Sequence, residues 1–181
     1  IGPGLGKKED ALMLLTDILT NFKKPVVIDA DALNLLAIHK HLWHEIPKNS
    51  VLTPHMKEFD RLFGDHTSWW KRIETGVLKA KEYKVYIVLK NDYTLCFTPE
   101  GKVYFNTSSN PAMATGGMGD VLTGIITSLL AQKYSPEQAC IIGAYLHGKA
   151  GDELALPNKL NVILPGKLAS QLPSTMAKLM A

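Results

Sequence analysis

The sequence predicts an α/β fold with a mostly parallel β-sheet covered by helices on both faces, a three-layer αβα sandwich. Short apolar runs at residues 25–30, 50–53 and 85–89 have the length and continuous apolar character of buried parallel strands. These runs alternate with helical segments, and that alternation implies parallel strands joined by helical crossovers. Residues 93–98 and 102–106 flank a Pro-Glu-Gly turn, which predicts a hairpin at an antiparallel edge.

The helical segments share apolar residues at spacings of three and four. They are predicted at residues 7–23, 32–38, 58–63, 69–83, 121–132 and 136–155. Asp31 directly precedes the second helix, so we expect it to be the N-cap of that helix. Pro136 occupies a first-turn position, where proline is favoured.

Composition excludes several classes of protein. The 181 residues are 46% hydrophobic, which is too apolar for a disordered chain. The net charge is only +3, with the basic residues scattered, so we expect no nucleic-acid partner. No apolar run is long enough to span a bilayer, so we expect no membrane association. Cys96 and Cys140 lie within apolar patterns, which favours buried thiols in a cytoplasmic protein.

The beginning of the sequence indicates an incomplete domain. Residues 1–6 (IGPGLG) resemble the last residue of a strand followed by a glycine turn. We therefore expect residues 1–181 to form one incomplete domain, with the rest of that strand before Ile1 and, as the family resemblance described below implies, further N-terminal strands missing. The positions of the candidate functional residues agree with this architecture, because each motif follows a strand, and ligands of such sheets bind beyond the carboxyl ends of the strands.

The most informative segment is residues 110–120 (NPAMATGGMGD), which leads directly into a helical pattern. Glycines at the start of a helix allow an anion to approach unpaired N–H groups at the positive end of the helix dipole. Gly117 and Gly119 would present such N–H groups to a transferring phosphoryl group. Asp120 would then accept a proton from the attacking hydroxyl. A tight turn with a capping aspartate is the alternative interpretation.

Acidic residues follow the first apolar run. Asp29 and Asp31 are candidates for holding a magnesium ion near a phosphate, directly or through water. A helix cap and a surface acid would explain the same two residues equally well.

Polar residues follow the other two runs. His55 and Glu58 are expected at the rim of the sheet, where both could be functional. The alternatives are that His55 is merely exposed and that Glu58 is an acid in the first turn of a helix. Lys90 would neutralise a nucleotide phosphate and Thr94 would hydrogen-bond to it, although an ordinary polar turn is the alternative. His147 lies inside a helix, where a structural contact is the simpler interpretation.

Four segments together resemble the ADP/ATP-dependent NAD(P)H-hydrate dehydratases of the ribokinase-like superfamily. They are residues 1–6 (IGPGLG), 27–34 (VIDADALN), 52–59 (LTPHMKEF) and 110–124 (NPAMATGGMGDVLTG). Members of this family are carbon–oxygen lyases that repair hydrated NADH or NADPH. They phosphorylate the hydroxyl of the hydrate and then eliminate phosphate. The chain differs from the usual family pattern at Met56 and Lys57 and at residues 91–93.

The resemblance implies specific roles. Asp120 would contact the hydrate and act as the base, and Gly4 and His55 would contact the hydrated dinucleotide. Gly119, with Gly117, would line the nucleotide site. The loop around the nucleotide would consist of Lys90, Asn91, Asp92, Tyr93 and Thr94. ADP or ATP would be the phosphoryl donor, with Mg²⁺ present, and Asp29 is the candidate metal ligand.

The resemblance also implies how the protein is organised. We expect a homo-oligomer, and fusion to an N-terminal NAD(P)H-hydrate epimerase domain is an option seen in many bacterial members. The main alternative function is a ribokinase-like kinase that phosphorylates a vitamin precursor or a sugar. A non-catalytic subunit or a fragment that packs against a missing partner is a further alternative.

Overall fold

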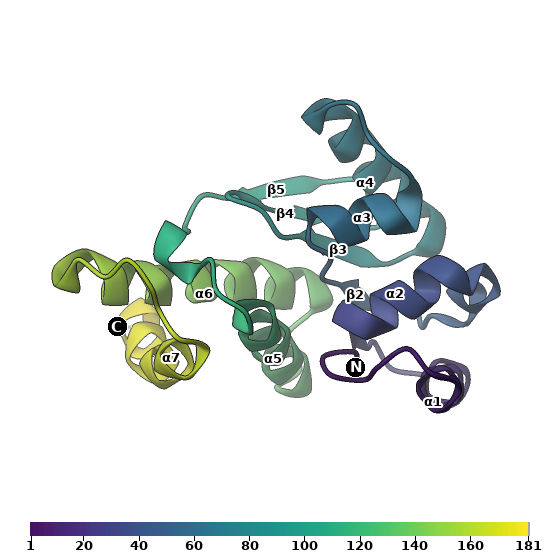
Figure 1. Cartoon of the computed structure of the whole chain (residues 1–181), viewed down its shortest axis with the longest axis horizontal. Helices are drawn as coiled ribbons and strands as arrows, with labels where there is room; N and C mark the ends of the chain where they lie inside the picture. Colours follow the sequence, from purple (N-terminus) through teal and green to yellow (C-terminus); the bar gives the residue numbers. More distant parts are fainter. Residues whose placement is uncertain (181) are drawn as a thin grey trace. The chain divides into compact units, whose positions relative to one another are not determined.

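The computed structural model describes residues 1–180 and contains two compact units (Figure 1). Unit 1 consists of residues 1–91 and 95–104, and unit 2 consists of residues 92–94 and 105–180. The helices and strands of unit 1, in chain order, are α1 (Glu9–Asn21), β1 (Val27–Ile28), α2 (Ala30–Ile38), the 3₁₀-helix η1 (Lys40–Glu45), β2 (Val51–Leu52), α3 (Met56–Phe63), α4 (Trp69–Tyr83) and β3 (Tyr86–Leu89).

The hairpin strands β4 (Thr94–Phe97) and β5 (Val103–Asn106) contribute residues to both units. The elements of unit 2 are the short 3₁₀-helix η2 (Pro111–Met113) and the helices α5 (Met118–Ala131), α6 (Pro136–Asn158) and α7 (Pro165–Met180). No helix among residues 1–180 has both the length and the apolar character that crossing a membrane requires.

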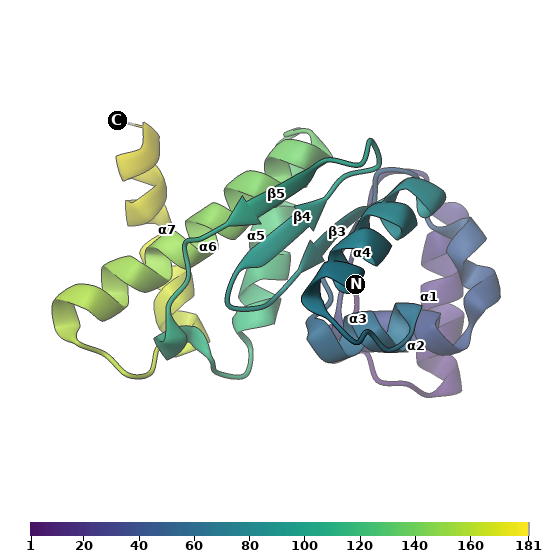
Figure 2. The same ribbon diagram turned by 90° about the horizontal axis from the view of Figure 1, so that it is seen from above.

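The strands form one sheet in the order β1-β2-β3-β4-β5. The first three strands are parallel, with Val27 opposite Val51 and Val51 opposite Tyr86. β4 pairs antiparallel with β3, as its register of Ile87 opposite Phe97 shows. Figure 2 shows β3, β4 and β5 side by side, with β5 last in the order. The predicted mostly parallel sheet with an antiparallel edge is therefore confirmed.

The core of unit 1 explains why these segments form these elements. All residues of β1, β2 and β3 are buried, as expected for strands covered on both faces. In α1 the buried residues Ala11, Leu15 and Leu19 recur every four positions, so they form one apolar stripe. Full burial of a leucine side chain such as Leu15 or Leu19 stabilises a fold by about 1.5–3 kcal/mol.

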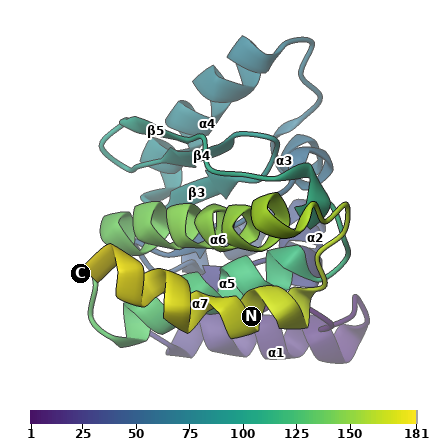
Figure 3. The same cartoon turned by 90° about the vertical axis from the view of Figure 1, so that its left-hand side faces the viewer.

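Unit 2 is built on close packing of helices, which its small residues permit. A Cβ atom on Gly143 of α6 would lie 2.8 Å from Cγ1 of Ile126 in α5, so only glycine allows this approach. α6 also contacts α7, where the buried hydroxyl of Thr175 donates to the Glu153 carboxylate at 2.8 Å. Figure 3 shows α7 lying alongside α6.

The boundaries of several elements differ from the predicted ones. The prediction included neither η1 nor α7. α3 begins at Met56 and α5 at Met118, two and three residues before their predicted starts. The prediction that Asp31 caps α2 is wrong, because α2 begins at Ala30 and Asp29 is its N-cap residue.

Candidate functional site

The carboxyl ends of three neighbouring strands in unit 1 carry polar residues that the sequence analysis singled out. Asp29 follows β1, and His55 lies shortly after β2, beyond Thr53 and Pro54. Lys90 follows β3 and forms an isolated parallel β-bridge with His55. Because β1, β2 and β3 are adjacent and parallel, these residues lie at one edge of the sheet. This edge is where α/β sheets bind ligands.

Asp29 and Lys90 form an ion pair at this edge. The Lys90 Nζ atom donates to Asp29 Oδ1 at 2.8 Å, and the Asp29 side chain is only 2% exposed. Although Asp29 is the N-cap residue of α2, its side chain makes no capping hydrogen bond. The backbone of Lys90 is fixed separately, because its N–H donates to the carbonyl oxygen of Pro54 at 2.8 Å.

The glycine turn at residues 2–6 packs directly against the end of β1. Gly2 has a φ of +131°, and a Cβ atom there would lie 1.8 Å from the backbone oxygen of Asp29. The N–H of Gly6 donates to Asp31 Oδ2 at 3.0 Å. Asp31 therefore holds the turn that contains Gly4, instead of capping α2. Gly4 itself is exposed and has a φ of +67°, a conformation that favours glycine.

Ile1 forms hydrogen bonds with β1 in the pattern of a parallel strand pair. Its terminal ammonium group donates to the carbonyl oxygen of Val27, and its own carbonyl oxygen accepts from the N–H of Asp29 at 3.0 Å. The two bonds bracket Ile28, as in a parallel ladder. The expectation that Ile1 has strand-like pairing before a glycine turn agrees with this geometry.

His55 and Glu58 form a capping box at the start of α3. The Glu58 carboxylate accepts from the His55 N–H at 2.8 Å, and His55 Nδ1 accepts from the Glu58 N–H at 3.3 Å. This mutual capping explains why α3 starts at Met56. Glu58 is buried, whereas the His55 side chain is 50% exposed. His55 is thus held in place with part of its ring accessible.

The predicted nucleotide loop spans both units, since Lys90 and Asn91 belong to unit 1 and residues 92–94 to unit 2. Asn91, Asp92 and Tyr93 are exposed, and Thr94 is half-buried at the start of β4. Within unit 2 the hydroxyl of Ser109 donates to the backbone oxygen of Asp92 at 2.6 Å. This bond ties the loop to the residue just before the glycine-rich motif.

In unit 2 the glycine-rich motif forms the N-terminus of α5. Gly117 is the N-cap residue with a φ of +90°, and the first helical bond runs from the Val121 N–H to its carbonyl oxygen. Gly119 and Asp120 lie in the first turn, and within residues 1–180 their N–H groups have no hydrogen-bond acceptor. Such N–H groups at the positive end of a helix favour an anion.

Asp120 occupies this turn as an accessible acid. Its side chain is exposed, and no hydrogen bond or ion pair to another described residue engages its carboxylate. The carboxylate is therefore available to a ligand that reaches the start of α5.

The helix α6 contacts the chain at the beginning of the motif. A Cβ atom on Gly148 would lie 2.0 Å from the backbone oxygen of Ser108, so the chain before the motif packs directly against this glycine. Asn110 donates to Asp152 Oδ1 at 3.2 Å and also caps η2 by accepting from the Ala112 N–H. The sequence did not predict this role of Asp152, although its position directly after the Gly-Lys-Ala-Gly stretch indicates a closely packed helix face.

No group of three or more His, Cys, Asp and Glu side chains that could hold a metal gathers in the described part of the chain. A magnesium ion usually keeps several waters and binds through substrate phosphates with one or two carboxylates. The donor set of this chain fits that mode and does not fit a dedicated protein cage. Asp29 as a ligand stays a prediction, and its carboxylate already contacts Lys90.

Comparison with known proteins adds independent information. A family model described as NAD(P)H-hydrate dehydratase matches residues 1–174. The bifunctional NAD(P)H-hydrate repair enzyme Nnr of Moorella thermoacetica is 40% identical over 181 residues, which are 99% of this chain and 34% of that protein. The ADP-dependent (S)-NAD(P)H-hydrate dehydratase of Neisseria meningitidis is 41% identical over 157 residues, which are 84% of this chain and 53% of that protein.

Solved structures are also similar to this chain. An ADP/ATP-dependent NAD(P)H-hydrate dehydratase from Bacillus subtilis, co-crystallized with ATP/Mg²⁺, has a TM-score of 0.82 and 31% identity, covering 98% of this chain and 63% of that one. A ribokinase from Thermotoga maritima has a TM-score of 0.56 at 18% identity, a likeness of fold alone. The chain thus spans about a third of the bifunctional relatives and under two thirds of these single-function relatives.

Proposed function

The chain belongs to the NAD(P)H-hydrate dehydratase family, and we propose that the protein containing it dehydrates hydrated NADH or NADPH with a nucleotide as phosphoryl donor. The function would be repair of nicotinamide cofactors. The names of the similar proteins support this proposal, since they include both bifunctional repair enzymes and ADP-dependent dehydratases.

The reaction follows from leaving-group chemistry. Hydroxide leaves a carbon atom slowly, whereas phosphate leaves readily. The hydroxyl oxygen of the hydrate would attack the terminal phosphorus of the nucleotide, and the bond between that phosphorus and its bridging oxygen would break. ADP would thus become AMP, or ATP would become ADP. Phosphate would then leave from the ring carbon while the neighbouring carbon loses a proton, which restores the double bond of the dihydronicotinamide.

The observation that carries the proposal is the N-terminus of α5. The N–H groups of Gly119 and Asp120 have no acceptor among the described residues, and the exposed Asp120 carboxylate lies in the same helical turn. The N–H groups would stabilise negative charge on the transferring phosphoryl group. The Asp120 carboxylate would accept the proton that the attacking hydroxyl loses.

Residues of unit 1 have binding roles in this proposal. Lys90 would attract the phosphates of the nucleotide, with Asn91 following it in the loop, and residues 92–94 would complete that loop from unit 2. The half-exposed His55 and the exposed Gly4 would contact the hydrated dinucleotide. Magnesium would neutralise phosphate charge and be held chiefly by the nucleotide itself.

A small-molecule kinase is the weaker candidate. A hydroxyethylthiazole kinase and two ribokinases of solved structure are 15%, 18% and 17% identical to the chain, and that likeness shows only the fold. Fusion to an epimerase domain agrees with the bifunctional relatives, of which this chain covers about a third. Cytoplasmic location and homo-oligomeric assembly stay predictions from the sequence.

The test mixes the full-length protein with hydrated NADH or NADPH and with ADP or ATP, and it follows the absorbance of the dihydronicotinamide. We expect the absorbance to recover in proportion to the AMP or ADP formed. Nucleotide turnover that requires another alcohol, with no recovery of absorbance, would contradict the proposal.

A further inference from the structure

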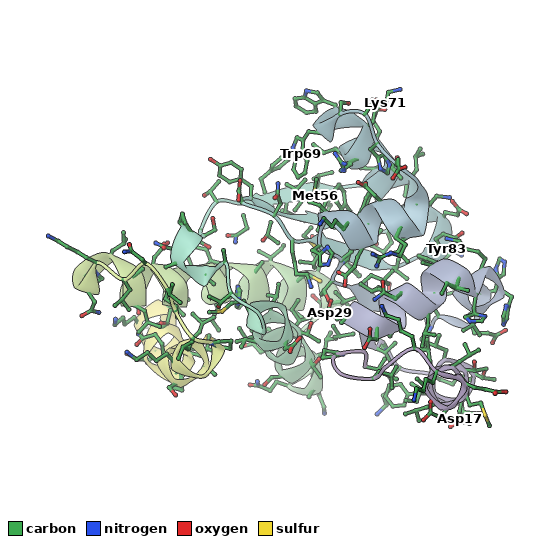
Figure 4. The ribbon with its side chains drawn as sticks, in the orientation of Figure 1. Asp17, Asp29, Met56, Trp69, Lys71 and Tyr83 are labelled. Carbon is green, nitrogen blue, oxygen red and sulfur yellow. The ribbon has the colours of Figure 1, made fainter. Side chains whose placement is uncertain are left out.

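The ion pair between Asp29 and Lys90 is partly buried and lies at the same sheet edge as His55. Asp29 is 1% exposed as a residue, and its carboxylate oxygen lies 2.8 Å from the Lys90 ammonium nitrogen. The Lys90 side chain is 20% exposed, so part of it remains reachable. Figure 4 labels Asp29 where β1 passes into α2.

The backbone next to this carboxylate has an unusual conformation. The next residue, Ala30, has a φ of +49°, which is rare for a residue with a side chain. Such a conformation costs on its own and persists only where surrounding contacts impose it. The close approach of Gly2 to the backbone oxygen of Asp29 is one such contact. The Asp29 side chain makes no capping bond and accepts a hydrogen bond from Lys90.

A lysine ammonium has three hydrogen-bond donors and a flexible stem. Asp29 engages one donor and fixes the ammonium group, while the Lys90 N–H is fixed by the carbonyl oxygen of Pro54. The remaining donors can bind a phosphate without the cost of ordering a free lysine side chain.

We propose that Asp29 is a positioning residue that holds the Lys90 ammonium ready for a nucleotide phosphate. The inference rests on the proposed function, in which Lys90 binds the nucleotide. Asp29 itself acts only through Lys90. In this role the carboxylate is a counter-ion of lysine, which differs from its predicted role as a magnesium ligand.

The test is a double-mutant cycle on ADP binding, measured by calorimetry with the full-length protein. The variants are Asp29→Asn, Lys90→Met and the double variant. We expect Asp29→Asn alone to raise the Kd about tenfold, which is the loss of one well-placed charged contact. In the Lys90→Met background we expect Asp29→Asn to change the Kd less than about twofold, because the group it positions is gone.

Two other results would overturn the proposal. An equal rise of Kd in both backgrounds would show that Asp29 acts independently of Lys90. Tighter or unchanged ADP binding by Asp29→Asn would show that the ion pair does not prepare Lys90. Since the cycle measures binding alone, turnover of the hydrate by the wild type tests the proposed function separately. Unchanged ADP binding by Lys90→Met would show that Lys90 does not bind the nucleotide, and this would also overturn the proposal.

Controls address folding. Leu19→Ala removes a buried core side chain of α1 that is not among the candidate site residues, so it reports whether loss of stability alone changes the Kd. If Asp29→Asn does not fold, Asp29→Glu replaces it, because it keeps the charge and moves the carboxylate by one bond of about 1.5 Å. We then expect a rise of about threefold in the Kd, and an unchanged Kd would overturn the proposal.

Discussion

The Nε2 atom of His147 lies 3.0 Å from the carbonyl oxygen of Met118 and so joins the middle of α6 to the first turn of α5. A carbonyl oxygen can only accept, so Nε2 carries the proton. Met118 directly precedes Gly119 and Asp120, whose N–H groups form the proposed anion site. The structure therefore supports the interpretation of His147 as a helix-contact residue, and its contact holds the turn that we propose carries the chemistry.

Replacing His147 by phenylalanine tests this contact. The change keeps an aromatic ring and removes the donor, so we expect a loss of about 1 kcal/mol in the free energy of unfolding. Urea denaturation measures it. Tyr145→Phe on the exposed side of α6 is the control, and we expect it to stay within about 0.5 kcal/mol of the wild type. Equal stability of both variants would mean that the His147 bond contributes nothing.

The contact between α6 and the chain before the glycine-rich motif predicts opposite effects of alanine substitution at two glycines. A Cβ atom on Gly148 would lie 2.0 Å from the backbone oxygen of Ser108, whereas one on Gly124 of α5 would meet nothing within 4 Å. We expect Gly148→Ala to lower stability by about 2 kcal/mol or more and to reduce turnover. We expect Gly124→Ala to stabilise by up to about 1 kcal/mol. Thermal unfolding and turnover of both variants measure the difference. Equal stability and equal turnover of the two variants would refute the claim that Gly148 supports the motif.

A separate network stabilises unit 1 between α3 and α4. The guanidinium of Arg72 donates twice to the Asp60 carboxylate, at 3.0 and 2.7 Å, and His66 Nδ1 lies 2.8 Å from the same carboxylate. The Arg72 hydrogen bonds hold the pKa of Asp60 below its ordinary value of 3.8, although partial burial opposes this effect. The network is distinct from the candidate functional residues.

The lowered pKa of Asp60 sets the pH dependence of its contribution to stability. A depressed folded-state pKa means that the contribution is present above pH 3.8 and is lost as the pH falls through the lower folded-state value. We expect Asp60→Asn to lose about 2 kcal/mol near neutral pH and progressively less in acid. Denaturation across pH 2–7 checks this, with Asp17→Asn in α1 as the exposed control. A loss that does not depend on pH would contradict the ion pair.

The sequence predicted the fold well because its strongest signals are local. Continuous apolar runs and helical spacing locate the parallel strands and most helices, and the Pro-Glu-Gly turn locates the hairpin. The start of α3 was missed because a histidine forms its capping box, and this residue is not among the common caps. The start of α5 was missed because Gly117 caps the helix through its backbone conformation alone.

Long-range pairing accounts for what the sequence could not predict about the candidate site. The positions of Asp29, His55 and Lys90 at strand ends follow from the alternating pattern, but the ion pair joins residues that are 61 positions apart. Similarly, the bond from Asn110 to Asp152 joins a loop to a distant helix. No local pattern distinguishes Asp29, which reaches across to Lys90, from Asp31, which holds the glycine turn.

Asp120→Asn provides the most direct test of the central claim that Asp120 accepts the proton at the start of α5. The full-length variant is assayed with hydrated NADH and ADP, beside Asp17→Asn in α1 as a control for the same chemical change on an exposed helix. We expect turnover to fall at least about 100-fold while ADP binding stays within about twofold, because the change removes a proton acceptor and little volume. Unchanged turnover would contradict the account.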